Sequence, residues 1–284
     1  MTTAAIGAVL RVGLFAVDGA GCSRQALRLG HALAEAGVAL TEPGQACDLL
    51  VTALASPADV DALLAGPGGG WPSGSRQGAM TAGSSTPCLV VEMGMLAPRE
   101  VQAAAARLLA RGVDMLDVSQ VAEGALRAGG SAAAFERARP LLSRLGSDLR
   151  HVGAIGTGRA IGCCHSILDA LTTEAVAEAL TLARRLGADP SRVRAALAGG
   201  FAASHVLDVH GARMLSRDFA PALEAGVAAD ALGVVIDEAH ALGLDLPGSA
   251  LVAQQLNALV GAGDAGLDSS ALVKVLERMA GETL

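Results

Sequence analysis

The segment 151–189 constrains the fold of this chain more than any other stretch. It opens with HVGAIGTG, whose closely spaced glycines indicate a tight turn. The residues that follow, above all 172–186, are apolar at helical spacing and leave no polar face. Such a helix must be buried on every side, so it predicts other helices packed around it. A helical second half, organised around this segment, is therefore expected.

The residues before this segment predict an α/β domain, because short apolar runs without helical period alternate with helical patterns. The predicted strands are 10–17, 38–41, 48–54, 88–93 and 113–119. The predicted helices are 23–36, 56–66, 98–112 and 131–146. Pro140 should kink or divide the last of these helices. Strands that alternate with helices favour a parallel sheet, so residues 1–150 are expected to form a Rossmann-like domain.

Residues 151–284 are expected to form a helical domain that contacts substrate and makes a dimer. After the central helix, the predicted helices are 191–200, 204–216, 221–243, 247–263 and 269–281. A bundle of this size does not easily bury a helix that is apolar all round. We therefore expect a partner subunit to cover part of it in a homodimer.

The Rossmann-like domain is expected to be abbreviated. Only EPGQAC separates the strand that ends at Thr41 from the one that begins at Asp48, which is too short for another crossover and strand. The glycine fingerprint after the first strand is also incomplete, since its positions fall on Ala16, Asp18 and Gly21. A carboxylate at Asp18 would repel a pyrophosphate. Two interpretations stay open: a turn that binds no cofactor, and a degenerate NAD(P) turn made by Asp18, Gly19 and Gly21.

Composition excludes several classes of partner and of chemistry. The net charge is -7 without a basic stripe, which argues against nucleic acid and anionic membranes. No run reaches the roughly 18 apolar residues of a membrane span, and the N-terminus lacks the charged start of a secretory signal. The five cysteines include no CxxC pair, which indicates reduced thiols. A cytoplasmic protein is therefore expected. No HxxxH or HExxH spacing indicates a metal site. The chain has one lysine, Lys274, and no tyrosine, so proton transfer must fall to His, Asp, Glu or Cys.

From about Leu10 to Glu282 the chain resembles the β-hydroxyacid dehydrogenases, in the 6-phosphogluconate dehydrogenase-like superfamily that includes 3-hydroxyisobutyrate dehydrogenase and, more distantly, imine reductases. The motifs that carry the resemblance are CLVVEMGMLAP, RGVDMLDVS, HVGAIGTG, VAEALTLARRLGADP, RMLSRDF and ALGLDLPG, in that order. The resemblance implies a Rossmann domain, a helical second domain, and a dimer that buries the helical half. It also implies hydride transfer between NAD(P) and a small hydroxy acid in a cleft between the domains.

The resemblance also implies functional positions, and this chain carries other residue types there. The nicotinamide-side Ser and Thr of the family fall on Gly94 and Met95, and its substrate-binding serine falls on Val121. Its catalytic lysine falls on Gly162 and the asparagine one turn later falls on Ser166. A later Lys-Asp pair falls on Asp230 and Ala231. We therefore expect a divergent member that has kept the fold and lost the catalytic lysine.

Other residues could supply the chemistry. Ser166 and Asp169 lie at i+4 and i+7 from Gly162 on a helix, with His165 beside them, and a His165–Asp169 hydrogen bond would support a general base. Together with Asp230 these are the predicted catalytic residues.

The predicted substrate-binding residues are Arg159, His205, Arg213 and Val121, the two arginines as carboxylate binders. The segment 66–87, which contains Trp71, is either a surface loop or a lid.

Three functions remain open at this point. The first is a repurposed lyase or isomerase that acts on a small acidic metabolite without a cofactor, through His165 and Asp169. The second is an NAD(P)H-dependent oxidoreductase of imine-reductase or β-hydroxyacid dehydrogenase type, with Asp169 or Asp230 as proton donor. The third is an inactive homologue that only binds a metabolite. The replaced family positions favour the first.

Overall fold

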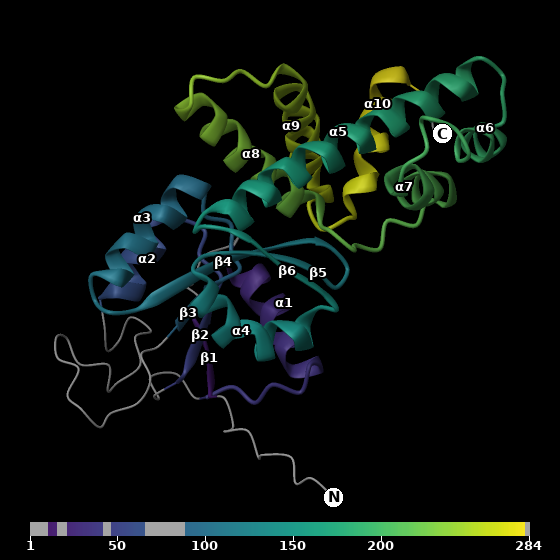
Figure 1. The fold of residues 1–284 in the computed structure, drawn as a ribbon. Helices are drawn as coiled ribbons and strands as arrows, with labels where there is room; N and C mark the ends of the chain where they lie inside the picture. Colours follow the sequence, from purple (N-terminus) through teal and green to yellow (C-terminus); the bar gives the residue numbers. More distant parts are fainter. Residues whose placement is uncertain (1–10, 16–21, 42–46, 66–88, 282–284) are drawn as a thin grey trace, which may run out of the picture. The chain divides into compact units, whose positions relative to one another are not determined.

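The computed structural model describes residues 11–15, 22–41, 47–65 and 89–281, with side chains of the first helix from residue 27 onward (Figure 1). The calls on Asp18, Gly19, Gly21 and the segment 66–87 lie outside these residues. The chain divides into two compact units, Met1–Gly162 and Cys163–Leu284. No helix among the described residues is both long and apolar enough to cross a membrane.

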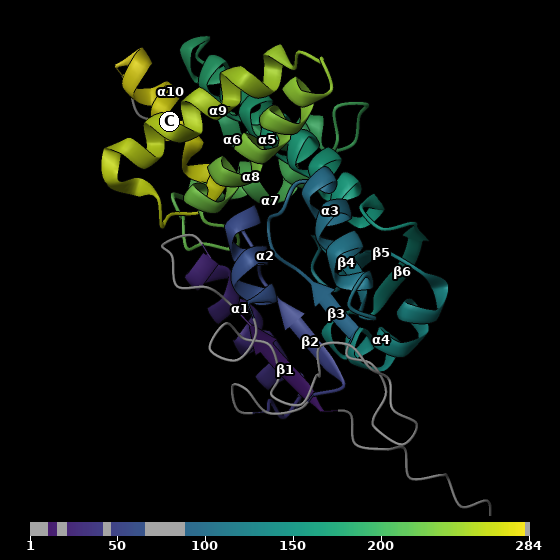
Figure 2. The ribbon, with the colours of Figure 1, turned by 90° about the vertical axis from the view of Figure 1, so that its left-hand side faces the viewer.

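The first unit is built on one six-stranded sheet whose strands lie side by side in chain order (Figure 2). The strands are β1 (Val12–Phe15), β2 (Leu49–Thr52), β3 (Leu89–Glu92), β4 (Asp114–Ala122), β5 (Ala125–Gly129) and β6 (Asp148–Gly153). Every neighbouring pair is parallel except β4 and β5, which form an antiparallel hairpin. The predicted α/β fold class is confirmed, with this one departure from a parallel sheet.

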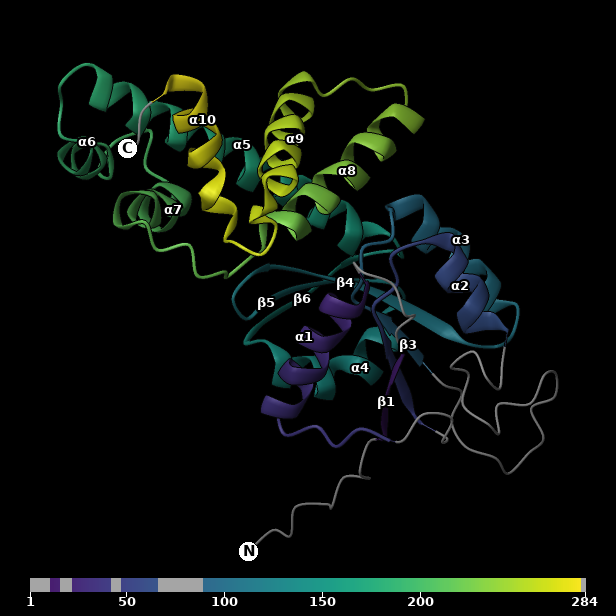
Figure 3. The same ribbon diagram turned by 180° about the vertical axis from the view of Figure 1, so that it is seen from behind.

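Four helices cover the two faces of the sheet, as Figures 1 and 3 show. They are α1 (Cys22–Glu35), α2 (Pro57–Leu64), α3 (Pro98–Leu109) and α4 (Ala132–Leu145). Alternate residues of a strand point to opposite faces. Accordingly Val51 and Val91 pack with α1 and α4 in one core, while Leu50 and Val90 pack with α2 and α3 in another. The unit is a three-layer α/β/α sandwich.

The predicted strand 38–41 was wrong, because only Leu40 pairs with β1. Val12 bridges Leu40 on one side and pairs with Leu49 on the other, both in parallel. The chain must reach the opposite flank of β1 by residue 49, so it leaves the first flank after a single bridge. Leu40 and β2 thus flank β1 on its two sides.

Two strands were missed by the sequence analysis, and one predicted break is absent. The strand β6 has the sequence DLRHVG and is an edge strand without buried residues, so it lacks an apolar signal. The strand β5, with the sequence ALRAG, owes its place to its hairpin with β4. Pro140 lies inside α4 and does not divide it. Its ring is exposed to solvent.

The second unit is helical, as predicted. The helix α5 (Thr157–Arg185) starts in the first unit and continues into the second, where it is followed by α6 (Pro190–Leu197), α7 (His205–Ser216), α8 (Ala225–Ala241), α9 (Pro247–Leu259), the π-helical turn η1 (Val260–Asp264), the 3-10 turn η2 (Ser269–Leu272) and α10 (Val273–Ala280). The helices α8 and α9 lie side by side (Figure 1) and share one core with η2 and part of α5. A second core joins α5 and α7.

The helix α5 is only partly covered by the described residues of its own chain. Val176, Ala177 and Leu180 are buried, but Leu168 and Leu182 are 69% and 60% exposed. The apolar character of α5 therefore exceeds what this chain alone covers.

Candidate functional site

A buried carboxyl group, Glu92, ends β3 at the carboxyl edge of the sheet. Thr52, its register partner at the end of β2, donates a short hydrogen bond to Glu92 Oε2. The amides of Leu54 and Gly94 donate to Glu92 Oε1 over 3.2 and 2.5 Å. Burial nevertheless raises the pKa of Glu92 to about 8, against the opposing effects of these hydrogen bonds and of the Arg159 charge. At neutral pH this carboxyl group is mostly protonated.

Gly94 has no room for a side chain. A Cβ atom there would clash with the Leu54 backbone and with the Glu92 carboxyl group. The resemblance puts a hydroxyl-bearing residue of the family at this position. In this chain the carboxyl group of Glu92 fills the same space instead.

A second buried carboxyl group, Asp117 on β4, holds the first turn of α5. Asp117 accepts hydrogen bonds from the backbone amides of Gly156 (2.8 Å) and Arg159 (2.7 Å). Burial raises the pKa of Asp117 above its ordinary value, although the two amides act in the opposite direction. Glycines allow this close approach: a Cβ atom at Gly129 would lie 2.5 Å from Asp117 Oδ1, and one at Gly158 would clash with Asp117 backbone. The start of α5 is therefore positioned directly on β4 and β5.

The guanidinium group of Arg159 lies beside the buried hydroxyl group of Ser119. Arg159 Nε donates to Leu96 O over 3.0 Å and Nη1 donates to Ser119 Oγ over 3.2 Å. A Cβ atom at Gly162 would lie 2.5 Å from Ser119 Oγ and 3.6 Å from Arg159 Nη1. The hydroxyl and guanidinium groups thus occupy the space that a side chain at position 162 would need.

The sequence analysis missed Ser119 and chose Val121. Strand alternation could have found it, because residue 119 shares a face with Asp117. Val121 lies at a register shift in the β4–β5 pairing, between Gln120 and Ala122, and is half-buried. Val121 was chosen because the resemblance puts the substrate-binding serine of the family at that position.

Three of the predicted catalytic residues meet at a pocket of about 40 Å³ in the second unit. The polar groups around it come from His165, Ser166, Asp169, Thr173 and Ser269, and apolar side chains of α8, α9 and η2 complete the wall. Ser269 Oγ is buried without a hydrogen-bond partner in the described part of the chain. No hydrogen bond joins His165 to Asp169 among the described residues.

The other predicted site residues lie elsewhere. Asp230 on α8 and His205 at the start of α7 are exposed and do not line this pocket. Arg213 binds a carboxylate of its own chain, with Nη1 2.7 Å from Asp268 Oδ2, and donates to Ala220 O over 2.8 Å. Within the described residues, no group of three or more His, Cys, Asp or Glu side chains could hold a metal ion.

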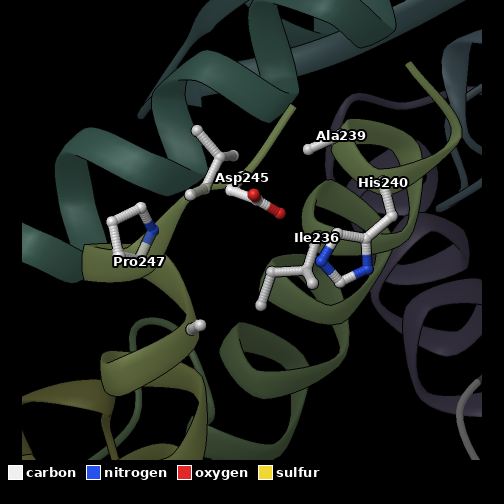
Figure 4. A pocket seen from close by; sticks show the side chains of 7 residues that line it. Ile236, Ala239, His240, Asp245 and Pro247 are labelled. Carbon is white, nitrogen blue, oxygen red and sulfur yellow. The ribbon is translucent and has the colours of Figure 1, made fainter. Parts of the chain in front are cut away.

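A larger pocket of about 130 Å³ lies between the end of α8 and the start of α9. His240 and Asp245 border it above a floor that includes Ile236 (Figure 4). Both polar residues are exposed, and none of the predicted site residues belongs to this pocket.

Comparisons with known proteins support a redox family. The family model described as "NAD-binding of NADP-dependent 3-hydroxyisobutyrate dehydrogenase" matches residues 156–276. The chain is 39% identical over 204 residues to 2-hydroxy-3-oxopropionate reductase of Escherichia coli (strain K12). This match covers 69% of this chain and 70% of that protein. It is 30% identical over 234 residues to a mitochondrial 3-hydroxyisobutyrate dehydrogenase-like protein of Arabidopsis thaliana, and this match covers 82% of this chain and 69% of that protein. The structure of Mycobacterium tuberculosis 3-hydroxyisobutyrate dehydrogenase with L-serine matches with a TM-score of 0.73 at 22% identity, covering 94% of this chain and 99% of that one.

The prediction of cofactor-free lyase or isomerase chemistry was wrong, because these relatives are reductases and dehydrogenases. The error has a physical cause. In hydride-transfer enzymes the cofactor carries the redox step, and the protein supplies binding, orientation and electrostatics. Changed side chains around the substrate are therefore poor evidence that the class of reaction has changed.

Proposed function

Because the chain belongs to the β-hydroxyacid dehydrogenase family, we propose that it is an NAD(P)-dependent oxidoreductase that interconverts a small hydroxy acid and the corresponding oxo acid. The observation that carries the proposal is the 39% identity to 2-hydroxy-3-oxopropionate reductase over 70% of that protein. A three-carbon oxo acid of that kind is accordingly the first substrate to test.

The described part of the sheet fits a nicotinamide dinucleotide. The carboxyl ends of the parallel strands β1 to β4 meet at one edge of the sheet, the edge at which doubly wound folds bind such cofactors. Glu92 at the carboxyl edge is mostly neutral at pH 7 and so does not repel a pyrophosphate. The turn with Asp18, Gly19 and Gly21 is the proposed phosphate contact. When bound, the cofactor supplies or accepts the hydride.

Proton transfer is assigned to the pocket on α5. By the resemblance, Gly162 takes the position of the family's lysine, and the one lysine of the chain, Lys274, is paired with Asp264 at 2.7 Å. His165 and Asp169 line one pocket with Ser166, and imidazole and carboxyl groups are the usual side chains for general acid-base catalysis. In the proposed reaction one of them exchanges the proton of the substrate oxygen.

A homodimer is part of the proposal. The exposed Leu168 and Leu182 on α5 and Leu251 on α9, which is 54% exposed, are large apolar side chains that a second copy can cover. Light scattering coupled to size-exclusion chromatography tests this directly, with a dimer mass expected.

The test of the function begins with calorimetric titration of NADPH and NADH, followed by turnover of 2-hydroxy-3-oxopropionate measured by the absorbance of the reduced nicotinamide. His165→Ala and Asp169→Asn are expected to lower kcat by about 10²- to 10⁴-fold if they transfer the proton. The control His31→Ala changes an exposed histidine on α1, outside the pocket. If neither cofactor binds, the oxidoreductase assignment fails. If both pocket variants retain full kcat, only the proton assignment fails.

A further inference from the structure

Arg159 is a half-buried arginine whose hydrogen-bond acceptors are all neutral. Its guanidinium group donates to the Leu96 carbonyl oxygen and to the Ser119 hydroxyl oxygen. No carboxylate of the described chain forms an ion pair with it, and Nη2 donates to none of the described residues. A cation that is partly removed from water in this way is costly unless an anion accompanies it.

Other half-buried arginines of the protein are neutralised internally. The guanidinium groups of Arg127 and Arg213 both lie 2.7 Å from carboxylate oxygens, those of Asp148 and Asp268, respectively. The carboxyl groups close to Arg159 do not play this part. Asp117 receives the backbone amide of residue 159 instead of its guanidinium group, and Glu92, with a pKa of about 8, is mostly protonated at neutral pH.

The Arg159 guanidinium group is held in place before any ligand arrives. Asp117 fixes the backbone of residue 159, and Leu96 and Ser119 fix the side chain through Nε and Nη1. Preorganisation of this kind lowers the entropy lost on binding. Gly162 is the neighbouring position one turn along α5, where any larger residue would displace the Ser119 hydroxyl group.

The hydrogen bond between the two side chains also orients Ser119. A hydroxyl group has one proton to donate and two lone pairs. Because Ser119 Oγ accepts from Arg159 Nη1, its own proton is available to another acceptor. The pair therefore offers the N–H groups of Nη2 and one O–H group, which suits the two oxygens of a carboxylate.

We propose that Arg159 and Ser119 bind the carboxylate of the substrate, with Gly162 keeping the space above α5 open for the pair. The identity of the ligand as a small hydroxy acid rests on the proposed function. A singly charged carboxylate fits better than a phosphate dianion, because the Asp117 carboxyl group lies close to the same guanidinium group.

Calorimetric titration of racemic glycerate, a three-carbon hydroxy acid, tests the proposal, with and without saturating NADPH. Glyceramide, the uncharged amide analogue of glycerate, serves as the second probe. Arg159→Gln is expected to weaken glycerate binding by about 10- to 100-fold, since a hydrogen-bonded charge is lost. Ser119→Ala should weaken it by about 3- to 10-fold. Binding of glyceramide should change little in either variant.

Arg150→Gln is the matched control, because it removes the same charge from an exposed site of the same unit. Unchanged glycerate binding by Arg159→Gln, an equal loss for glycerate and glyceramide, or no glycerate binding by the native protein in either state would overturn the proposal. NADPH and glycerate titrations of the native protein separate the two proposals. Glycerate binding without NADPH binding would overturn the oxidoreductase and leave the anion site, whereas NADPH binding without glycerate binding would overturn the anion site and leave the oxidoreductase.

A double-mutant cycle tests the role of Gly162. Gly162→Ala places a Cβ atom 2.5 Å from Ser119 Oγ and should weaken glycerate binding by about 10-fold. In a Ser119→Gly background the same change should have little further effect, because the clashing hydroxyl group is gone. Equal effects in both backgrounds would show that Gly162 acts independently of Ser119, contrary to the proposal.

Discussion

Two buried carboxyl groups, Asp268 in the second unit and Glu92 in the first, have opposite pKa shifts. In the second unit, Asp268 is buried and ionised: hydrogen bonds from Ser270 and Ala222 lower its pKa although burial alone would raise it, and Arg213 lies 2.7 Å away. In the first unit, burial raises the pKa values of Glu92 and Asp117, and Arg159 has no carboxylate partner among the described residues. A charge that is neutralised by an ion pair inside the chain stabilises the fold, whereas a charge without an ion-pair partner is available to a ligand.

The largest expected effect comes from removing the Asp268 carboxylate, which neutralises Arg213. Asp268→Ala should lower the free energy of unfolding by about 3 to 5 kcal/mol, because it leaves Arg213 and several buried donors without their acceptor. Urea unfolding at pH 7 measures the change. The control Asp264→Ala removes a more exposed carboxylate, which pairs with Lys274 and Arg278, and should cost about 1 kcal/mol or less. Equal losses would mean that burial of the ion pair does not set its contribution.

The second effect is a pH dependence that comes from Glu92. The folded protein keeps this proton up to about pH 8, whereas the unfolded chain loses it near pH 4.5. Unfolding therefore releases a proton between these values, and stability should fall by a few kcal/mol as the pH rises through this window. Urea unfolding of the native protein and of Glu92→Gln measures the slope, which the variant should reduce. An unchanged slope would show that Glu92 is ionised in the fold. For Asp268, with its lowered pKa, the stabilisation is instead lost as the pH falls through its folded-state pKa.

The third effect concerns the contact between β5 and α5. Gly129→Ala should cost about 1 to 3 kcal/mol or more, because the added Cβ would lie 2.5 Å from Asp117 Oδ1 and 2.7 Å from Ala154 O. Gly233→Ala on α8 is the matched control. No atom lies within 4 Å of a Cβ at this position, so the change should stabilise the helix by up to about 1 kcal/mol. Thermal unfolding of both variants gives the comparison, and a stable Gly129→Ala would contradict the close packing.

The smallest expected effect is on the stability of Arg159→Gln, within about 0.5 kcal/mol of the native protein. The charge has no internal partner to lose, so its removal should affect ligand binding and not folding. Urea unfolding without ligand measures this. A loss of several kcal/mol would place Arg159 with Arg213 among the structural arginines and remove the contrast between these two residues.

Much of the fold could be predicted from sequence. Apolar runs such as DLLVTAL and helical patterns such as PREVQAAAARLL become β2 and α3, because burial of a strand or helix face leaves its period in the sequence. The strand β6 could not be predicted in the same way, since its side chains are not buried. Leu40 shows a different limit: its residue type suits a strand, but whether it pairs depends on where the chain must go next.

The candidate site was less predictable. Helical spacing grouped His165, Ser166 and Asp169, and the three line one pocket, because neighbours on a helix face are set by local geometry. Their catalytic role stays a prediction. Arg159 and Arg213, by contrast, looked alike as carboxylate binders. Their difference depends on Asp268, which is distant in sequence from Arg213, and on Ser119, which comes from another element than Arg159.

The sequence by itself therefore determined the division into an α/β half and a helical half, and the buried faces of elements such as β2 and α3, because these follow from local periodicity. Only the tertiary structure decided which charges are neutralised and which stay open, because burial and ion pairing arise between side chains that the folded backbone brings together.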